Sequence, residues 1–242
     1  MCTASWLTAA DGYELYFNRD ERLSRARSLA PRESSLRGVR YMAPIDPAGR
    51  GSWIAANELG VTLCLLNRYP DSLPAEAKTM SRGLIVLGMA DAAGADDVAG
   101  RLAEANPFGY RPFTLLVAAP QRGVTQFSFD GNGLDCRLFG GGEFATSSSR
   151  DDHAAGESRR ELWRMLRGTA EGSALHQRFH TSHWPTVSLL SVCMHREEAE
   201  TESFCHVRVG GESVELTFVA GPPCRDGEPV RSVLRRRATA AA

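Results

Sequence analysis

The stretch MCTASWLTAADGYELYFNRDE (residues 1–21) decides the fold, because it predicts two β-strands joined by a tight turn. Residues 3–9 and 13–18 form two β-prone runs, and Ala10-Asp11-Gly12 lies between them. Asp-Gly between two such runs is a strong signal for a β-hairpin. The hairpin would fold the second run back onto the start of the chain.

The position of the turn sets which residues meet at the chain start. If Asp11-Gly12 is the two-residue turn, Cys2 faces Glu21, and if the turn is Ala10-Asp11, Cys2 faces Arg19. In both registers Cys2 and Arg19 share one face of the sheet, because facing pairs and diagonal neighbours lie on the same side. A guanidinium beside a thiol favours the thiolate.

Cys2 directly follows Met1, and its small side chain permits removal of Met1. The product is a cysteine with a thiol of pKa about 8.5 and a free α-amine of pKa about 7.7–8.0. The amine can then exchange a proton with the sulfur, so the nucleophile needs no histidine as its base. Asp20 could hold the α-ammonium or orient Arg19 by a charge-assisted hydrogen bond.

The rest of the chain predicts one domain with strands at both ends and helices in the middle. Residues 22–50 are polar and are expected to form a long irregular loop. Expected strands are 53–56, 61–66, 113–118, 124–129, 134–139, 189–194, 204–209 and 214–219, and expected helices are 81–90, 96–105 and 159–166. This order predicts a single α+β domain of packed antiparallel sheets over residues 1–224. The Arg- and Ala-rich residues 225–242 are expected to form a flexible tail.

Composition excludes several classes of protein. The 242 residues carry 28 Lys+Arg against 29 Asp+Glu, so no overall charge favours nucleic acid. No apolar run approaches the roughly 18 residues that a membrane span requires. The first ten residues show no signal-peptide pattern, and the six cysteines are widely scattered. We therefore expect reduced thiols and a cytoplasmic location; the sequence does not indicate an oligomeric state.

The N-terminal residues resemble a known family. Met1-Cys2, the hairpin and Asn18-Arg19-Asp20-Glu21 resemble the NRDE family, whose eukaryotic members are called Transport and Golgi organisation protein 2. That family's second signature is similar to Gly51-Ser52-Trp53-Ile54-Ala55, Asn57, Gly60-Val61 and Leu66-Asn67-Arg68. The layout also resembles the choloylglycine hydrolase and penicillin V acylase group. Those are N-terminal-nucleophile hydrolases that cleave amide bonds and have a four-layer αββα sandwich fold.

The resemblance implies a set of site residues. Cys2 would be the nucleophile, Arg19 and Asp20 its electrostatic supports, and Asn67 a donor near the oxyanion hole. The related hydrolases carry a second asparagine in a Thr-Asn-Ser setting, for which Thr146-Ser147-Ser148 is the nearest match. Further candidates are Ser147 as a donor in place of that asparagine, Arg196 as the late arginine of those hydrolases, Asn18 as a substrate-binding residue, and Trp53 as a core residue or a substrate wall.

A hydrolase of this type implies a small-molecule amide substrate, no cofactor and no metal. The resemblance also leaves a second class open, a binding or trafficking protein that holds haem or a lipid-type ligand without turnover. A cysteine with nearby histidines could ligate haem iron. His176, His180 and His183 have helix-like spacing, but Pro185 follows closely, so surface histidines are expected. Cys193-Met194-His195 and Cys205-His206 do not match a zinc spacing and are expected to be structural.

Overall fold

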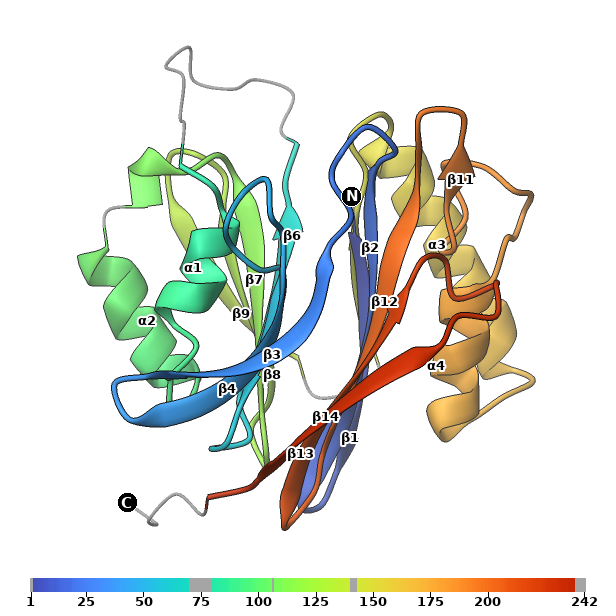
Figure 1. Cartoon of the computed structure of the whole chain (residues 1–242). Coiled ribbons are helices and arrows are strands. Elements are labelled where there is room, and N and C mark those ends of the chain that lie inside the picture. Colours follow the sequence, from blue (N-terminus) through green and yellow to red (C-terminus); the bar gives the residue numbers. More distant parts are fainter. Residues whose placement is uncertain (1, 70–79, 106, 140–142, 238–242) are drawn as a thin grey trace.

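A computed structural model describes residues 2–69, 80–105, 107–139 and 143–237. Two antiparallel sheets pack face to face, and helices cover the outer face of each sheet (Figure 1). This arrangement is the predicted α+β fold, a four-layer αββα sandwich. The expected removal of Met1 concerns a residue outside the described ranges.

The first sheet is built around the N-terminal hairpin. Its strand order is β10-β1-β2-β12-β13-β14, and β11 pairs with β12 beside this path. The strands are β1 (Cys2–Ala9), β2 (Gly12–Arg22), β10 (Phe144–Ser147), β11 (His195–Arg196), β12 (Ala199–Val209), β13 (Ser213–Ala220) and β14 (Pro229–Arg235). Ala9 pairs with Gly12, so Ala10-Asp11 is the turn and Cys2 faces Arg19 directly.

The second sheet runs in sequence order from β3 to β9. Its strands are β3 (Leu29–Leu36), β4 (Val39–Ile45), β5 (Ile54–Asn57), β6 (Thr62–Asn67), β7 (Phe113–Ala119), β8 (Gly123–Phe129) and β9 (Leu134–Phe139). The expectation of an irregular loop over 22–50 was wrong, because β3 and β4 form a hairpin there. Arg37 and Gly38 both have positive φ, as a two-residue hairpin turn of type I′ requires. Most residues of β3 are exposed, and its polar sequence hid this edge strand.

Within the described residues, four α-helices form the outer layers. α1 (Gly83–Gly88) and α2 (Ala95–Glu104) cover the second sheet, whereas α3 (Asp152–Arg167) and α4 (Gly172–Thr181) cover the first (Figure 1). A 3₁₀ turn, η1, spans Pro107–Gly109. The Asp151 side chain caps α3 by accepting from the amide of Ala154 at 2.8 Å. α4 was not predicted, and its His176 and His180 are buried, so the expectation of surface histidines was wrong for both.

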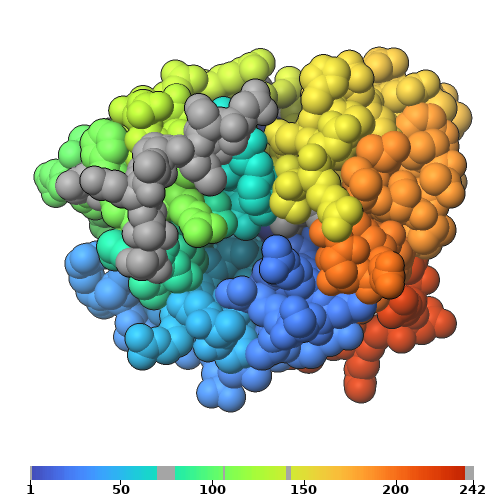
Figure 2. All heavy atoms as spheres, turned by 90° about the horizontal axis from the view of Figure 1, so that it is seen from above, coloured from blue at the N-terminus to red at the C-terminus, as the bar shows by residue number. Residues whose placement is uncertain are grey.

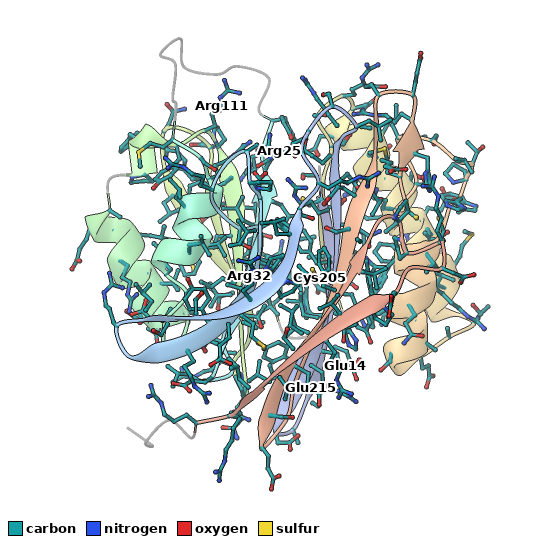
Figure 3. All side chains as sticks on the ribbon, viewed as in Figure 1. Glu14, Arg25, Arg32, Arg111, Cys205 and Glu215 are labelled. Carbon is teal, nitrogen blue, oxygen red and sulfur yellow. The ribbon has the colours of Figure 1, made fainter. Side chains whose placement is uncertain are left out.

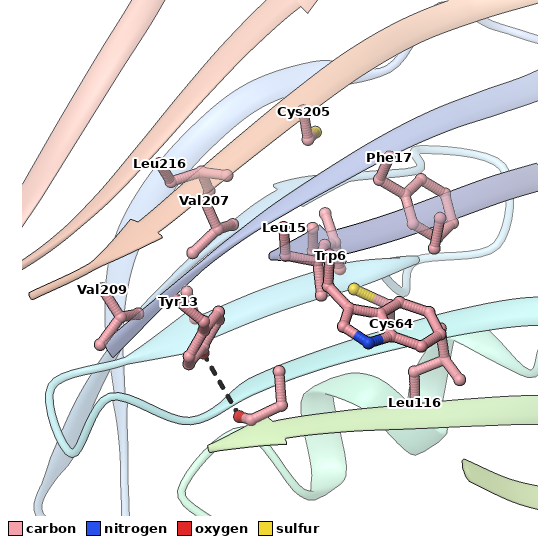
Figure 4. Packing of buried hydrophobic residues seen from close by; sticks show 14 of the residues in the cluster. Trp6, Tyr13, Leu15, Phe17, Cys64, Leu116, Cys205, Val207, Val209 and Leu216 are labelled. Carbon is pink, nitrogen blue, oxygen red and sulfur yellow. Dashed lines mark hydrogen bonds between the residues drawn. The ribbon is translucent and has the colours of Figure 1, made fainter. Parts of the chain in front are cut away.

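The core between the sheets fixes their alignment. Trp6, Leu15 and Phe17 of the first sheet pack against Cys64 and Leu116 of the second (Figure 4). All five side chains are fully buried. Each large apolar side chain buried in this way contributes about 1.5–3 kcal/mol, which makes this layer the main support of the sandwich.

Two C-terminal expectations were also wrong. Residues 189–194 form turns and bends rather than a strand, and β11 begins only at His195. Residues 229–235 of the expected flexible tail form β14, which pairs with β13 and buries Leu234.

Among the helices of the described residues, none is both long and apolar enough to cross a membrane.

Candidate active site

Cys2 lies in a row of side chains that crosses three strands. Its cross-strand partner on β10 is Ser147, and its partner on β2 is Arg19. Directly facing residues of neighbouring antiparallel strands project to the same side. That side faces the second sheet, because Cys2 belongs to the inter-sheet cluster and the Arg19 guanidinium lies 4.5 Å from the centre of the Trp53 ring.

A cavity of about 460 Å³ opens beside this row. Cys2, Arg19, Trp53 and Asn67 all contribute to its wall, together with residues 80–83. Seen from above, the surface is hollowed near its centre, between the blue and cyan N-terminal segments and the yellow segment that includes α3 (Figure 2). The hairpin, the strand β6 and the loop before α1 therefore enclose one space around the thiol.

A second cavity of about 550 Å³ lies against β10. Ser147 lines this cavity, and Asn67 lines both. The Asn67 amide donates to the Tyr69 hydroxyl at 3.2 Å. The Ser147 hydroxyl is buried and has no hydrogen-bond partner among the described residues. The structure thus places one free donor directly across the strand from Cys2.

Carboxylates and an aromatic ring hold Arg19 in place. Arg19 Nη1 donates to Glu202 Oε2 at 2.9 Å, and Nη2 donates to Glu21 Oε2 at 3.3 Å. Glu202 is itself fixed by the Ser28 amide at 2.8 Å. The sequence suggested that Asp20 could orient Arg19, but Glu202 performs this role in the structure. Glu202 carried no motif that would have identified it.

The environment of Cys2 holds opposing influences on its thiol. Burial raises the pKa of the Cys2 thiol above its usual range, and the nearby Asp20 carboxylate raises it further. The positive charges of the chain's amino terminus and of Arg19 lower this pKa, as does a hydrogen bond with the Asp20 backbone. Burial outweighs the charges that favour the thiolate, so the pKa of the Cys2 thiol is raised overall.

Asp20 projects to the opposite face of the first sheet from Arg19. Its Oδ1 accepts from the Thr201 hydroxyl at 2.7 Å. Burial raises the pKa of the Asp20 carboxyl, whereas Arg159, the amino terminus, the Thr201 hydrogen bond and Arg196 lower it. Burial outweighs these influences, so the pKa of the Asp20 carboxyl is raised overall.

Arg159 is a site-supporting residue that the sequence did not reveal. It is fully buried on α3, and its guanidinium donates to Thr3 Oγ1 at 3.0 Å and to the Ser191 carbonyl at 2.9 Å. It also donates to Thr146 Oγ1 and to the carbonyls of Leu189 and Leu190. α3 contains several arginines, and the sequence does not distinguish Arg159, which is buried, from the others.

Arg196, the candidate late arginine, lies on β11 with most of its side chain buried. Its Nη1 is buried without a hydrogen-bond partner among the described residues, and its Nε lies 3.4 Å from Glu198 Oε1. Its charge lowers the pKa of the Asp20 carboxyl. The structure thus brings Arg196 to Asp20 rather than into the wall of the cavity at Cys2.

Asn18 was expected to bind substrate, but the structure does not bring it to the cavity. It is fully buried beneath α4, where its amide nitrogen donates to the carbonyls of His180 at 2.9 Å and Val192 at 3.0 Å. Its Oδ1 lies 2.9 Å from His180 Nδ1. Because strand residues alternate between faces, Asn18 points toward the helices when Arg19 points toward the cavity.

The histidines of α4 are likewise separated from Cys2. The Ser5 hydroxyl lies 2.7 Å from His176 Nδ1 and 2.9 Å from His180 Nε2. These hydrogen bonds lie in the helical layer, on the other face of the sheet from the Cys2 thiol. A haem site shared by Cys2 and these histidines therefore does not fit the geometry.

The αββα sandwich has the fold of solved N-terminal-nucleophile hydrolases. A penicillin V acylase from Agrobacterium tumefaciens has a TM-score of 0.56 at 11% identity, covering 96% of this chain and 85% of that chain. A Caenorhabditis elegans ortholog of N-acylethanolamine-hydrolyzing acid amidase has a TM-score of 0.56 at 9% identity, and the match covers 85% of this chain and 92% of that chain. A variant of conjugated bile acid hydrolase from Clostridium perfringens has a TM-score of 0.54 at 10% identity, and the match covers 98% of this chain and 97% of that chain.

The chain belongs to the Transport and Golgi organisation 2 family. The model of this family matches residues 1–154, which include Cys2, the hairpin and Ser147. This match confirms the family that the N-terminal residues indicated. No curated protein sequence matched the chain.

Proposed function

We propose that this chain is an N-terminal-cysteine amidohydrolase that cleaves a small, non-peptide amide. The observation that carries the proposal is the position of Cys2, which lies directly across from both Arg19 and Ser147 and lines a cavity of about 460 Å³. That volume suits a small molecule. We place the enzyme in the cytoplasm, where its six unpaired cysteines would stay reduced.

The reaction would proceed through an acyl-thioester. After removal of Met1, the Cys2 α-amine accepts the thiol proton while the sulfur attacks the amide carbonyl. Asn67 and Ser147 donate to the oxyanion, and the ammonium returns its proton to the leaving amine as the C–N bond breaks. Water then attacks the thioester, which releases the acid and restores the thiol.

The charged residues around Cys2 would stabilise the thiolate and the α-ammonium that form when the proton moves from sulfur to nitrogen. Arg19, fixed by Glu202 at 2.9 Å, supplies positive charge beside the thiolate. When ionised, the Asp20 carboxylate supplies negative charge beside the α-ammonium. Burial raises the pKa of this carboxyl, and the charges of Arg159 and Arg196 oppose that rise. The two supports act from opposite faces of one strand, so each can be changed without removing the other.

Arginines at the mouth of the cavity favour a substrate that carries an anionic group. Arg25 is neutralised by Asp46 at 2.6 Å, whereas Arg82 donates to the Pro112 carbonyl at 2.8 Å. Burial lowers the pKa of the Arg82 guanidinium, and the charge of nearby Arg111 lowers it further. Arg111 and Arg25 project at the same end of the molecule (Figure 3). A carboxylate or phosphate on the substrate would relieve the repulsion between Arg82 and Arg111.

The test is hydrolysis of a panel of N-acyl amides, with and without a carboxylate, by the wild type and the Cys2→Ser and Cys136→Ser variants. We expect turnover in the wild type and in Cys136→Ser, whose changed residue is exposed on β9, and none in Cys2→Ser. Intact-mass analysis should show that the mature chain starts at Cys2 and that iodoacetamide modifies it first. Retention of Met1, or equal reactivity of Cys2 and Cys136, would refute the proposal.

A haem titration of the wild type and a Cys2→Ala variant tests the alternative, a ligand-binding protein without catalysis. A Soret shift that disappears in Cys2→Ala, together with no turnover on any amide, would favour that alternative.

A further inference from the structure

Four potential metal ligands from distant parts of the sequence converge beside β11. His183 follows α4, Cys193 precedes β11, His195 is the first residue of β11, and Cys224 lies in the turn after β13. One ligand atom from each residue lies within 4.8 Å of all the others. The cluster lies outside the cavity at Cys2 and is independent of the proposed function.

We propose that these four residues form a structural Zn²⁺ site. Zn²⁺ prefers four tetrahedral ligands drawn from thiolates and imidazoles, and two of each are present. Tetrahedral bonds of about 2.3 Å to sulfur and 2.0–2.1 Å to nitrogen place S and N about 3.6 Å apart. Cys193 Sγ lies 3.6 Å and Cys224 Sγ 3.3 Å from His195 Nε2.

The two histidines are arranged as metal-bound histidines are. His183 Nε2 is buried, and no hydrogen-bond partner for it exists among the described residues. A buried imidazole nitrogen without a partner is costly unless a ligand occupies it. On His195 the other ring nitrogen, Nδ1, lies 3.9 Å from Glu200 Oε2. This distance is too long for a hydrogen bond, so Glu200 acts on the His195 ring by its negative charge alone.

The site would fasten the segment that holds Arg159 and Asn18. The metal joins both ends of residues 183–195 to the turn that carries Cys224. This segment supplies the Ser191 carbonyl that accepts from Arg159 and the Val192 carbonyl that accepts from Asn18. Most of this segment forms turns and bends, without the regular hydrogen bonds of a β-sheet, so a bound metal would hold its backbone in place.

The sequence concealed this site. Cys224 is separated from Cys193 by 30 intervening residues, and no pair of ligands has the short Cys-x₂₋₄-Cys spacing of a zinc motif. Cys193 and His195 were expected to be structural core or strand residues, and we propose instead that both are zinc ligands.

The test is metal analysis of the untagged full chain, purified with a reductant and without chelators. We expect about one zinc per chain in the wild type and in Cys136→Ser, and less than about 0.1 in Cys193→Ser and Cys224→Ser. Replacing zinc with Co²⁺ in the wild type should give the intense visible bands of tetrahedral cobalt and a thiolate charge-transfer band. This spectrum reports on the site even if the variants do not fold.

Three outcomes would overturn the proposal. The first is a folded wild type with neither zinc nor a tetrahedral cobalt spectrum. The second is a disulfide between Cys193 and Cys224 in the native reduced preparation. The third is zinc loss in Cys136→Ser equal to that in Cys224→Ser, which would identify adventitious metal.

Discussion

Cys2 and Arg19 are direct cross-strand partners because the hairpin turns at Ala10-Asp11. A turn one residue later would place Glu21 opposite Cys2 and so exchange a positive neighbour for a negative one. Gly12 secures the observed register. A Cβ built on Gly12 would lie 1.8 Å from the Val209 carbonyl oxygen of β12, so the two backbones meet where only glycine fits.

Gly12→Ala should therefore lower the free energy of unfolding by about 3 kcal/mol, the cost of forcing atoms into a packed contact. Urea denaturation measures the change. Gly210→Ala is the matched control, because a Cβ there meets nothing within 4 Å. Equal stability of the two variants would show that the close approach of β12 does not secure the hairpin.

Ser147→Ala should separate catalysis from stability. The Ser147 hydroxyl has no hydrogen-bond partner among the described residues, so its loss should change the free energy of unfolding by less than about 0.5 kcal/mol. As an oxyanion donor it should nevertheless contribute about 100-fold to kcat, with little effect on KM. Steady-state kinetics on a hydrolysed amide test this prediction.

The matched control is Ser203→Ala. Ser203 pairs with Arg19 from the other side, and its hydroxyl is also buried without a partner, but it is not among the residues lining either cavity. Unchanged kcat in Ser147→Ala, or an equal fall in both variants, would remove Ser147 from the oxyanion hole.

Asn18→Leu should reduce stability rather than substrate affinity. The change leaves the Val192 carbonyl and His180 Nδ1 without their partner in a buried layer. An unsatisfied buried polar group costs about 1–3 kcal/mol, so we expect a loss of about 3 kcal/mol in all. Thermal unfolding and KM measured on the same protein decide the point. A raised KM at unchanged stability would restore the substrate-binding role that the sequence suggested.

Local sequence signals predicted the hairpin and its shared face, since strand alternation and the turn residues Ala10-Asp11-Gly12 are read from neighbours in the chain. Alternation also separates Asn18 and Asp20 from Arg19, but it does not say which face lines a cavity. That choice depends on the second sheet and on the helices, which pack only in the folded chain. For this reason the sequence did not reveal that Asn18 points toward α4 and away from the cavity at Cys2.

The roles of some residues depend on backbone groups far away in the sequence, and these roles could not be predicted from the sequence. Arg159 is enclosed because the carbonyls of residues 189–191 converge on it, and no pattern on α3 indicates them. β3 was missed because an edge strand that faces solvent needs few apolar residues. The ligand set of the proposed zinc site is likewise assembled from three separate elements.

Acidification should destabilise the protein between pH 6.5 and 4. Burial lowers the pKa of His176 to about 4 and that of His180 well below its usual value, whereas in the unfolded chain both titrate near 6.5. The unfolded state therefore binds more protons in this window, and stability is lost as the pH falls below 6.5. Each histidine contributes a slope of up to about 1.4 kcal/mol per pH unit.

Urea denaturation at pH 7.5, 6 and 5 tests this dependence. His176→Gln should flatten the slope by about one proton, and His153→Gln, at an exposed site, should leave it unchanged. The same slope in the wild type and in both variants would show that the buried histidines do not govern acid sensitivity.

Leu234→Ala tests whether the C-terminal residues belong to the folded domain. Leu234 is 1% exposed and lies on β14, opposite Val214 of β13. Truncation of a buried leucine leaves a cavity and costs about 2–5 kcal/mol, whereas in a flexible tail the change would cost nothing. Val233→Ala is the matched control, because Val233 is 52% exposed on the same strand. We expect a fall in thermal stability for Leu234→Ala alone; equal behaviour of the two variants would mean that β14 does not hold in solution.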